Sequence, residues 1–121
     1  MTTDLTQRNE PRIDVAQFQA VEMRVGRVIH AEPNEKARVP AYQMRVDFGQ
    51  EFGVKTTSAQ LTSNYTVDEL IGRLVIAVMN FPPRRVAGVK SEVLVLAAVD
   101  DANGVVLLHP DREVRLGARI L

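Results

Sequence analysis

The chain has 121 residues with 15 basic and 15 acidic side chains, so its formal net charge is zero. This length fits one domain of ordinary size, and a hydrophobic fraction of 45% supplies enough apolar material for a folded core. Because the sequence has no cysteine, disulfide scaffolds, thiolate zinc sites, iron–sulfur clusters and cysteine nucleophiles are excluded. Zero net charge also argues against a protein that coats nucleic acid indiscriminately.

The N-terminal residues carry no targeting signal that the sequence reveals. Residues 1–10 have no apolar stretch of the kind found in secretory signals, and the longest apolar runs, 74–79 and 93–99, are too short to cross a bilayer. We therefore expect a cytoplasmic protein without membrane insertion. Residues 1–12 are polar and predict a flexible N-terminal tail, which leaves 13–121 as the folded domain.

The domain is predicted to open with a short helix followed by a strand. Residues 14–20 begin with an aspartate in the N-cap position and predict one or two helical turns, docked on the core by Phe18. From 23 to 30 the apolar residues change to a period of two, which predicts a strand. Gly26 would allow a bend or a bulge in that strand.

The middle of the chain predicts a hairpin and a second short helix. Residues 32–40 contain prolines and charges typical of a loop. Residues 41–48 alternate apolar and polar side chains as a half-buried strand does, and 52–57 is the returning strand. Residues 66–72 begin with a threonine N-cap, carry acids in the first turn and end in glycine, so they predict a short helix.

The C-terminal part predicts further strands. Residues 74–81 form an apolar strand that two prolines end, and 93–99 form another. The turn at 100–104 predicts a hairpin in which 105–109 pairs back. The tail at 112–121 ends in two apolar residues.

This order of elements favours one fold class. It predicts an all-β protein, a five-stranded OB-fold barrel with a short helix between strands 3 and 4 and with N- and C-terminal extensions. A small immunoglobulin-like sandwich is the competing architecture, but it gives no reason for the helix.

The charge is unevenly distributed along the neutral chain. Residues 80–91 hold three basic side chains, Arg84, Arg85 and Lys90, and no acidic one. In an OB-fold this segment joins strands 4 and 5, and Arg38 lies in the loop between strands 1 and 2. Those two loops flank the face with which OB-folds bind oligonucleotides. The alternative is that the arginines are ordinary solvated loop charges.

Catalysis has little support in the sequence. His30 and His109 are isolated, without the spacing of metal or catalytic motifs. The acidic pair Asp68 and Glu69 falls in the first turn of the predicted helix, where capping explains it. We therefore expect no enzymatic activity, no metal and no cofactor.

Two separated motifs resemble a known family. Residues 14–32 resemble the F-x-x-V-(D/E)-(I/M)-R-V-G-x-V opening of the bacterial tRNA-binding domain, and residues 80–96 resemble its N-(L/F)-x-P-R-x-(L/I)-x-G-x-x-S-E signature. Relatives include a stand-alone tRNA-binding protein and the C-terminal appendix of methionyl-tRNA synthetases. Residues 58–60, 81–85 and 91–96 look most like the CsaA branch of export-related chaperones. The resemblance implies an OB-fold.

The resemblance also implies which residues bind. Arg84 and Arg85 would meet phosphate or peptide carboxylates, and Asn80 and Ser91 would hydrogen-bond bases or backbone. Arg38 and Lys55 would supply charge at the groove edge, whereas Ser58 and Gln60 could equally cap the following turn. The predicted site residues are therefore Asn80, Arg84, Arg85, Lys90, Ser91, Arg38, Lys55, Ser58 and Gln60.

Other residues near these motifs are expected to be structural. Leu94 is expected in the core, and Glu92 is expected to orient an arginine or to cap a strand end. Aromatic residues make up only 5% of the chain, which favours recognition of a folded RNA or a peptide over base stacking on exposed rings. The aromatic side chains expected mostly at core positions are Phe48, Phe52, Phe81, Tyr42 and Tyr65.

Three functions remain open from the sequence. The first is a CsaA-like chaperone that binds exported preproteins without ATP, the second is an accessory protein that binds folded tRNA, and the third is a scaffold for a synthetase-like partner. The resemblance implies a homodimer with both terminal extensions at its interface. Ile120 and Leu121 suit such an interface but could equally pack on their own barrel.

Overall fold

The computed structural model describes residues 11–121. The predicted N-terminal tail falls almost entirely on residues 1–10, which lie outside the described residues. Within the described part, two helices and nine strands follow one another along the chain. Their bounds are α1 Val15–Gln19, β1 Met23–Pro33, β2 Tyr42–Asp47, β3 Val54–Ala59, α2 Val67–Leu70, β4 Leu74–Val78, β5 Arg84–Val86, β6 Val89–Ser91, β7 Leu94–Val95, β8 Ala97–Asp100 and β9 Gly104–Leu107.

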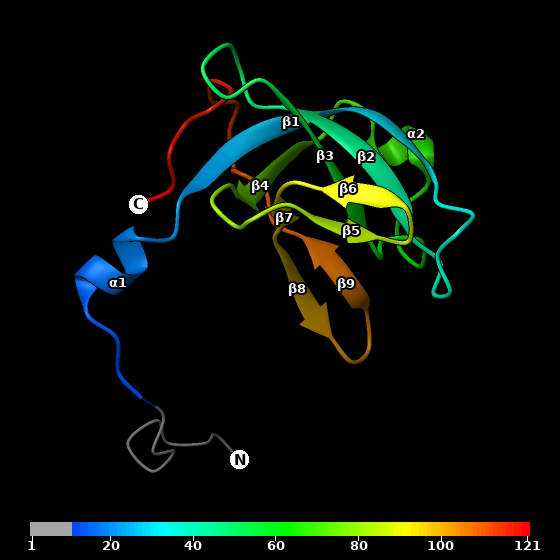
Figure 1. The fold of residues 1–121 in the computed structure, drawn as a ribbon, viewed down its shortest axis with the longest axis horizontal. Helices are drawn as coiled ribbons and strands as arrows, with labels where there is room; N and C mark the ends of the chain where they lie inside the picture. The colour runs from blue at the N-terminus through cyan, green and yellow to red at the C-terminus, as the bar shows by residue number, and fades with distance from the viewer. Residues whose placement is uncertain (1–10) are drawn as a thin grey trace.

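Five strands form one antiparallel sheet in the order β3-β2-β1-β4-β7 (Figure 1). The long strand β1 pairs with β2 through its second half and with β4 through its first half. A long, shared first strand allows the sheet to curl on itself. The helix α2 stands between β3 and β4 in the chain, as the sequence predicts.

Contacts between β3 and the segment before β7 bring the two ends of this sheet together. The backbone N–H of Glu92 donates to the carbonyl of Thr56 at 2.8 Å, and the Thr57 hydroxyl donates to the carbonyl of Val93 at 2.8 Å. The sheet is thereby nearly closed into a five-stranded barrel. The prediction of an all-β OB-fold barrel with a short helix between strands 3 and 4 is confirmed.

The barrel interior holds the apolar face of β2 together with the inner faces of β1 and β4. Met44 and Val46 on β2 and Phe48 just beyond it are fully buried, while Arg45 between them is exposed. Leu70 of α2 is also fully buried, so the helix closes one end of the core. The alternation expected of residues 41–48 is thus confirmed.

The bulge that the sequence allows at Gly26 lies further along β1. The irregularity in the β1–β2 pairing lies between Val28 and His30, not at Gly26. A Cβ atom on Gly26 would lie 2.6 Å from Val46 Cγ1 and 2.7 Å from the Phe48 ring. Glycine is therefore needed at this position because the Phe48 ring packs directly on the backbone of β1.

Helix α1 has the predicted cap but not the predicted docking. The Asp14 side chain accepts from the backbone N–H of Gln17 at 2.8 Å, and the Gln17 side-chain oxygen accepts from the backbone N–H of Asp14 at 2.8 Å. However, α1 buries no residue and Phe18 is 39% exposed, so the expected docking by Phe18 is wrong. Figure 1 shows α1 standing apart from the barrel.

Two predictions in the C-terminal half need correction. The apolar run 93–99 is not one strand, because β7 completes the five-stranded sheet whereas β8 pairs with β9 in a separate hairpin. The segment 80–91, predicted as a loop, contains the two-stranded hairpin of β5 and β6. Beyond β9, the C-terminal residues run beside the first half of β1, where Ile120 N–H donates to the carbonyl of Met23 at 3.1 Å.

Candidate binding groove

A groove of about 860 Å³ opens between the loop at 34–41 and the β5–β6 hairpin. We refer to it as the groove. Its floor comes from the end of β3 and from the segment that leads into β7. The lining residues are Ala37, Arg38, Val39, Ala41, Ser58, Ala59, Gln60, Phe81, Pro82, Pro83, Arg84, Val86, Ala87, Ser91, Glu92, Val93 and Leu94. The two loops that the sequence predicts to flank a binding face therefore do flank a groove.

Five of the nine predicted site residues line this groove: Arg38, Ser58, Gln60, Arg84 and Ser91. Arg38 and Arg84 come from opposite loops, and both side chains are exposed. Ser58 belongs to β3, where it pairs with Gln43, so it does not begin a turn. The structure thus brings together in one place residues that are as much as 53 positions apart in the sequence.

Three other predicted cations lie outside the groove lining. Arg85 and Lys90 face each other across the β5–β6 ladder, and Arg85 Nη1 donates to the carbonyl of Gly88 at 3.3 Å. Lys55 pairs with Val46 near the start of β3. Arg85 and Lys90 therefore add positive charge to the back of the same hairpin that presents Arg84 to the groove.

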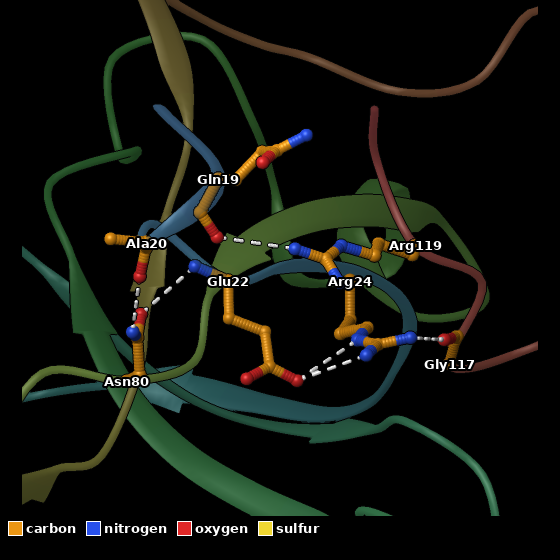
Figure 2. A network of polar contacts seen from close by, with 7 residues as sticks. All are labelled: Gln19, Ala20, Glu22, Arg24, Asn80, Gly117 and Arg119. Carbon is orange, nitrogen blue, oxygen red and sulfur yellow. Dashed lines mark hydrogen bonds and ion pairs between the residues drawn. The ribbon is translucent and has the colours of Figure 1, made fainter. Parts of the chain in front are cut away.

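Asn80 also lies outside the groove lining and has an internal role. Its side-chain amide donates to the carbonyl of Ala20 at 2.7 Å, and its side-chain oxygen accepts from the backbone N–H of Glu22 at 3.0 Å. Figure 2 shows this pair of bonds holding the link between α1 and β1. Both ends of the Asn80 amide are thus used in fixing where the N-terminal extension leaves the barrel.

Two arginines make further bonds in the same region, and one of them reaches α1. Arg119 donates to the carbonyl of Gln19 at 3.2 Å, and Arg24 donates to the carbonyl of Gly117 at 3.2 Å while pairing with Glu22 at 3.0 Å (Figure 2). Hydrogen bonds therefore connect both extensions to the barrel, and α1 adds no buried side chain to them.

Phe81 and Leu94 are groove residues that sequence reasoning assigned to the core. Phe81 is 54% exposed and Leu94 is 51% exposed, and both line the groove. The last β1–β4 backbone bond joins Met79 to Glu22 at 2.8 Å, so the chain has left the barrel by Phe81. The doubled proline after Phe81 is the sequence signal that the strand has ended.

Glu92 has a structural role in the groove floor. One of its carboxylate oxygens accepts from the backbone N–H of Thr56 at 3.1 Å. The backbone N–H of Glu92 donates to the carbonyl of the same Thr56. Thr56 is the third residue of β3, so the carboxylate satisfies a donor within the strand and not at its end, and the expected cap of a strand end is not found. With Arg38 and Arg84 it leaves an excess of one positive charge among the residues that line the groove.

Most residues that line the groove are apolar or small, and its charged side chains are Arg38, Arg84 and Glu92. Within residues 11–121 no cluster of three or more His, Asp or Glu side chains could hold a metal ion, and no helix there is long and apolar enough to span a membrane. Hydrogen bonds from Thr66 lower the pKa of Glu69, and hydrogen bonds from Asn103 and Ala102 lower the pKa of Asp100. Neither carboxylate lines the groove.

Residues 23–119 match the family described as "Putative tRNA binding domain". The chain belongs to the tRNA-binding domain family. Two solved structures with the same fold are CsaA chaperones, one from Bacillus anthracis with 48% identity and one from Picrophilus torridus with 42% identity. Each has a TM-score of 0.86 and is covered over its whole length, by 92% and 91% of this chain.

Curated sequence relatives include methionine–tRNA ligases. The ligase of Methanosarcina acetivorans is 36% identical over 110 residues, which make up 91% of this chain but only 15% of the ligase. The chain therefore corresponds to one domain of these ligases. The CsaA chaperones, by contrast, are matched over their whole length.

Proposed function

We propose that this chain is a non-catalytic CsaA-like chaperone whose groove binds extended, partly apolar segments of exported preproteins without ATP. The observation that carries the proposal is the exposure of Phe81 and Leu94 inside a groove that also presents Arg38 and Arg84. Apolar side chains of a client would cover the two exposed hydrophobic residues. Client carboxylates would pair with the arginines.

The two prolines support this type of ligand. Pro82 and Pro83 line the groove next to Phe81, and fixed φ angles keep the segment from losing much conformational freedom when a client binds. Such a groove binds through its shape and through apolar area. The same chemistry accepts many client sequences, as a chaperone for different preproteins requires.

The second candidate function is binding of folded tRNA. It is favoured by the basic side chains that the 34–41 loop and the β5–β6 hairpin carry inside and outside the groove: Lys36, Arg38, Arg84, Arg85 and Lys90. Phosphates of a tRNA would meet these cations over a wider surface than a peptide would cover. Membership in the tRNA-binding domain family supports this function as well.

The response to salt separates the two ligands. Fluorescence anisotropy would measure binding of a labelled tRNA and of a labelled precursor peptide at low and high ionic strength. Each phosphate that a basic side chain neutralises makes tRNA affinity fall more steeply with salt, whereas a peptide held by apolar contacts loses little. Peptide binding that resists salt supports the chaperone function. Binding of tRNA that weakens steeply with salt, together with no binding of the peptide, contradicts it.

Two matched double variants locate the ligand. Arg38→Ala/Arg84→Ala removes both groove cations, and Arg85→Ala/Lys90→Ala removes the same charge from the back of the hairpin. For a peptide in the groove only the first variant weakens binding, because only those side chains reach the ligand. Equal effects of the two variants on peptide binding would contradict a site within the groove.

We further propose a cytoplasmic homodimer in which the terminal extensions form the interface. The apolar side chains of Val15 and Phe18 on α1 and of Leu121 at the C-terminus are 70%, 39% and 97% exposed. A second copy of the chain would cover them. The exposure of Leu121 argues against packing of this residue on its own barrel, the alternative that the sequence leaves open.

A further inference from the structure

Asn34 occupies an unusual position in the loop at 34–41. It is 8% exposed, and with Thr57 it makes up the buried polar residues of the described chain. Its backbone N–H donates to the carbonyl of Ala41 at 2.8 Å, and its side-chain oxygen accepts from the backbone N–H of Lys36 at 3.2 Å. These bonds close the loop on itself and leave the side-chain amide free to reach another element.

That amide crosses to the other side of the groove. Asn34 Nδ2 donates to the carbonyl of Ala87 at 3.3 Å, and Ala87 lies at the tip of the β5–β6 hairpin. Through this hydrogen bond a side chain of the 34–41 loop holds the backbone of the hairpin. The bond opposes separation of the two loops, because parting them exchanges a hydrogen bond shielded from water for one to solvent.

The tip that Asn34 holds has a demanding backbone conformation. Ala87 has φ +48° and Gly88 has φ +83°, the positive values that a tight two-residue hairpin turn requires at both central positions. Glycine adopts such a value freely, but alanine does so at a cost. The Lys36 side chain packs over this turn, since a Cβ on Gly88 would lie 3.1 Å from Lys36 Cδ.

We propose that Asn34 is a positioning residue that joins the 34–41 loop and the β5–β6 hairpin into one rigid rim. The bond to Ala87 fixes the hairpin against the loop, and so it sets the separation of Arg38 and Arg84 across the groove. A preorganised rim spares the ligand the cost of ordering two loops. This role in binding rests on the proposed function, whereas the mechanical link between the loops does not.

The link is tested by hydrogen exchange in Asn34→Ala and in a matched control, Asn64→Ala. Asn64 also donates its amide to backbone carbonyls, those of Asn103 and Val105 at 2.6 and 2.8 Å, but in the β8–β9 hairpin. In Asn34→Ala we expect amides of residues 84–91 to exchange about 3- to 10-fold faster, as loss of one hydrogen bond permits. In Asn64→Ala those amides should be unchanged.

Peptide affinity gives the second readout. We expect Asn34→Ala to weaken binding of a labelled precursor peptide about 3- to 10-fold, with no loss in Asn64→Ala. Should Asn34→Ala fail to fold, Asn34→Asp retains the acceptor for Lys36 N–H and replaces the donor to Ala87 by a carboxylate oxygen that repels the Ala87 carbonyl, so exchange of residues 84–91 should again be faster. Unchanged exchange in residues 84–91 would overturn the link.

The outcomes also separate this proposal from the proposed function. Faster exchange with unchanged peptide binding, in a protein whose binding still depends on Arg38 and Arg84, would overturn the positioning role alone. If the Arg38→Ala/Arg84→Ala variant also binds peptide normally, the proposed function fails. Hydrogen exchange in Asn34→Ala would then be the test of the link between the two loops. Faster exchange of residues 84–91 supports the link, and unchanged exchange overturns it.

Discussion

Truncation of Phe81 tests the apolar part of the groove most sharply. An aromatic side chain buries about 150–250 Å² when fully covered, and Phe81 is 54% exposed. A ligand that covers it therefore removes about 100 Å² from water, worth about 2.5 kcal/mol at ~25 cal/mol per Å². Phe81→Ala is accordingly expected to weaken peptide binding by up to about 70-fold.

The assay is fluorescence anisotropy with a labelled precursor peptide at two salt concentrations. Phe81→Leu keeps most of the apolar area and should lose less than about 10-fold. Val99→Ala serves as control, because Val99 is 80% exposed on β8 and does not line the groove. If Phe81→Ala binds the peptide as tightly as the unmodified chain, the exposed ring does not contact the ligand and the reasoning is refuted.

Three further predictions concern stability, protonation and assembly. Gly26→Ala should lower the free energy of unfolding by about 1–3 kcal/mol through the clash with Phe48, and urea unfolding with an unchanged midpoint would contradict it. The backbone N–H of Thr66 lowers the pKa of Glu69 most, and the Thr66 side chain lowers it further. Thr66→Ala keeps the backbone bond and loses the side-chain contribution, so it should raise the pKa of Glu69 only part of the way toward its ordinary value. The stabilisation that Glu69 provides is present above its unfolded pKa and is lost as pH falls through the folded pKa; an NMR titration with an unmoved pKa refutes the assignment. Phe18→Asp should shift the protein from dimer to monomer in light scattering, and a dimer of unchanged strength would place the interface elsewhere.

Local signals explain why much of the barrel could be predicted from the sequence. The alternation of residues 41–48 places Met44 and Val46 inside because the side chains of a strand alternate between its faces. Helix α2 begins at a reciprocal cap between Thr66 and Glu69, which the residue types and their spacing specify. The order of these elements was then sufficient to predict the OB-fold.

What could not be predicted depends on contacts between distant residues. Phe81 continues an apolar run, so its sequence looks like core, and only the end of the β1–β4 pairing places it in the groove. The bond from Asn34 to Ala87 joins residues 53 positions apart, and no local pattern indicates it. Asn80 belongs to the motif, but its side chain bonds Ala20 and Glu22 and so fixes the link between α1 and β1. The motif alone does not predict these two bonds.

The most direct test of the proposed groove is NMR mapping of a bound precursor peptide on isotope-labelled protein. We predict that the largest chemical-shift changes fall on residues 37–39, 41, 58–60, 81–84, 86–87 and 91–94, which line the groove. Changes concentrated on α1 or on the β8–β9 hairpin, with the groove unaffected, would contradict the central claim that this chain binds its client between the two loops.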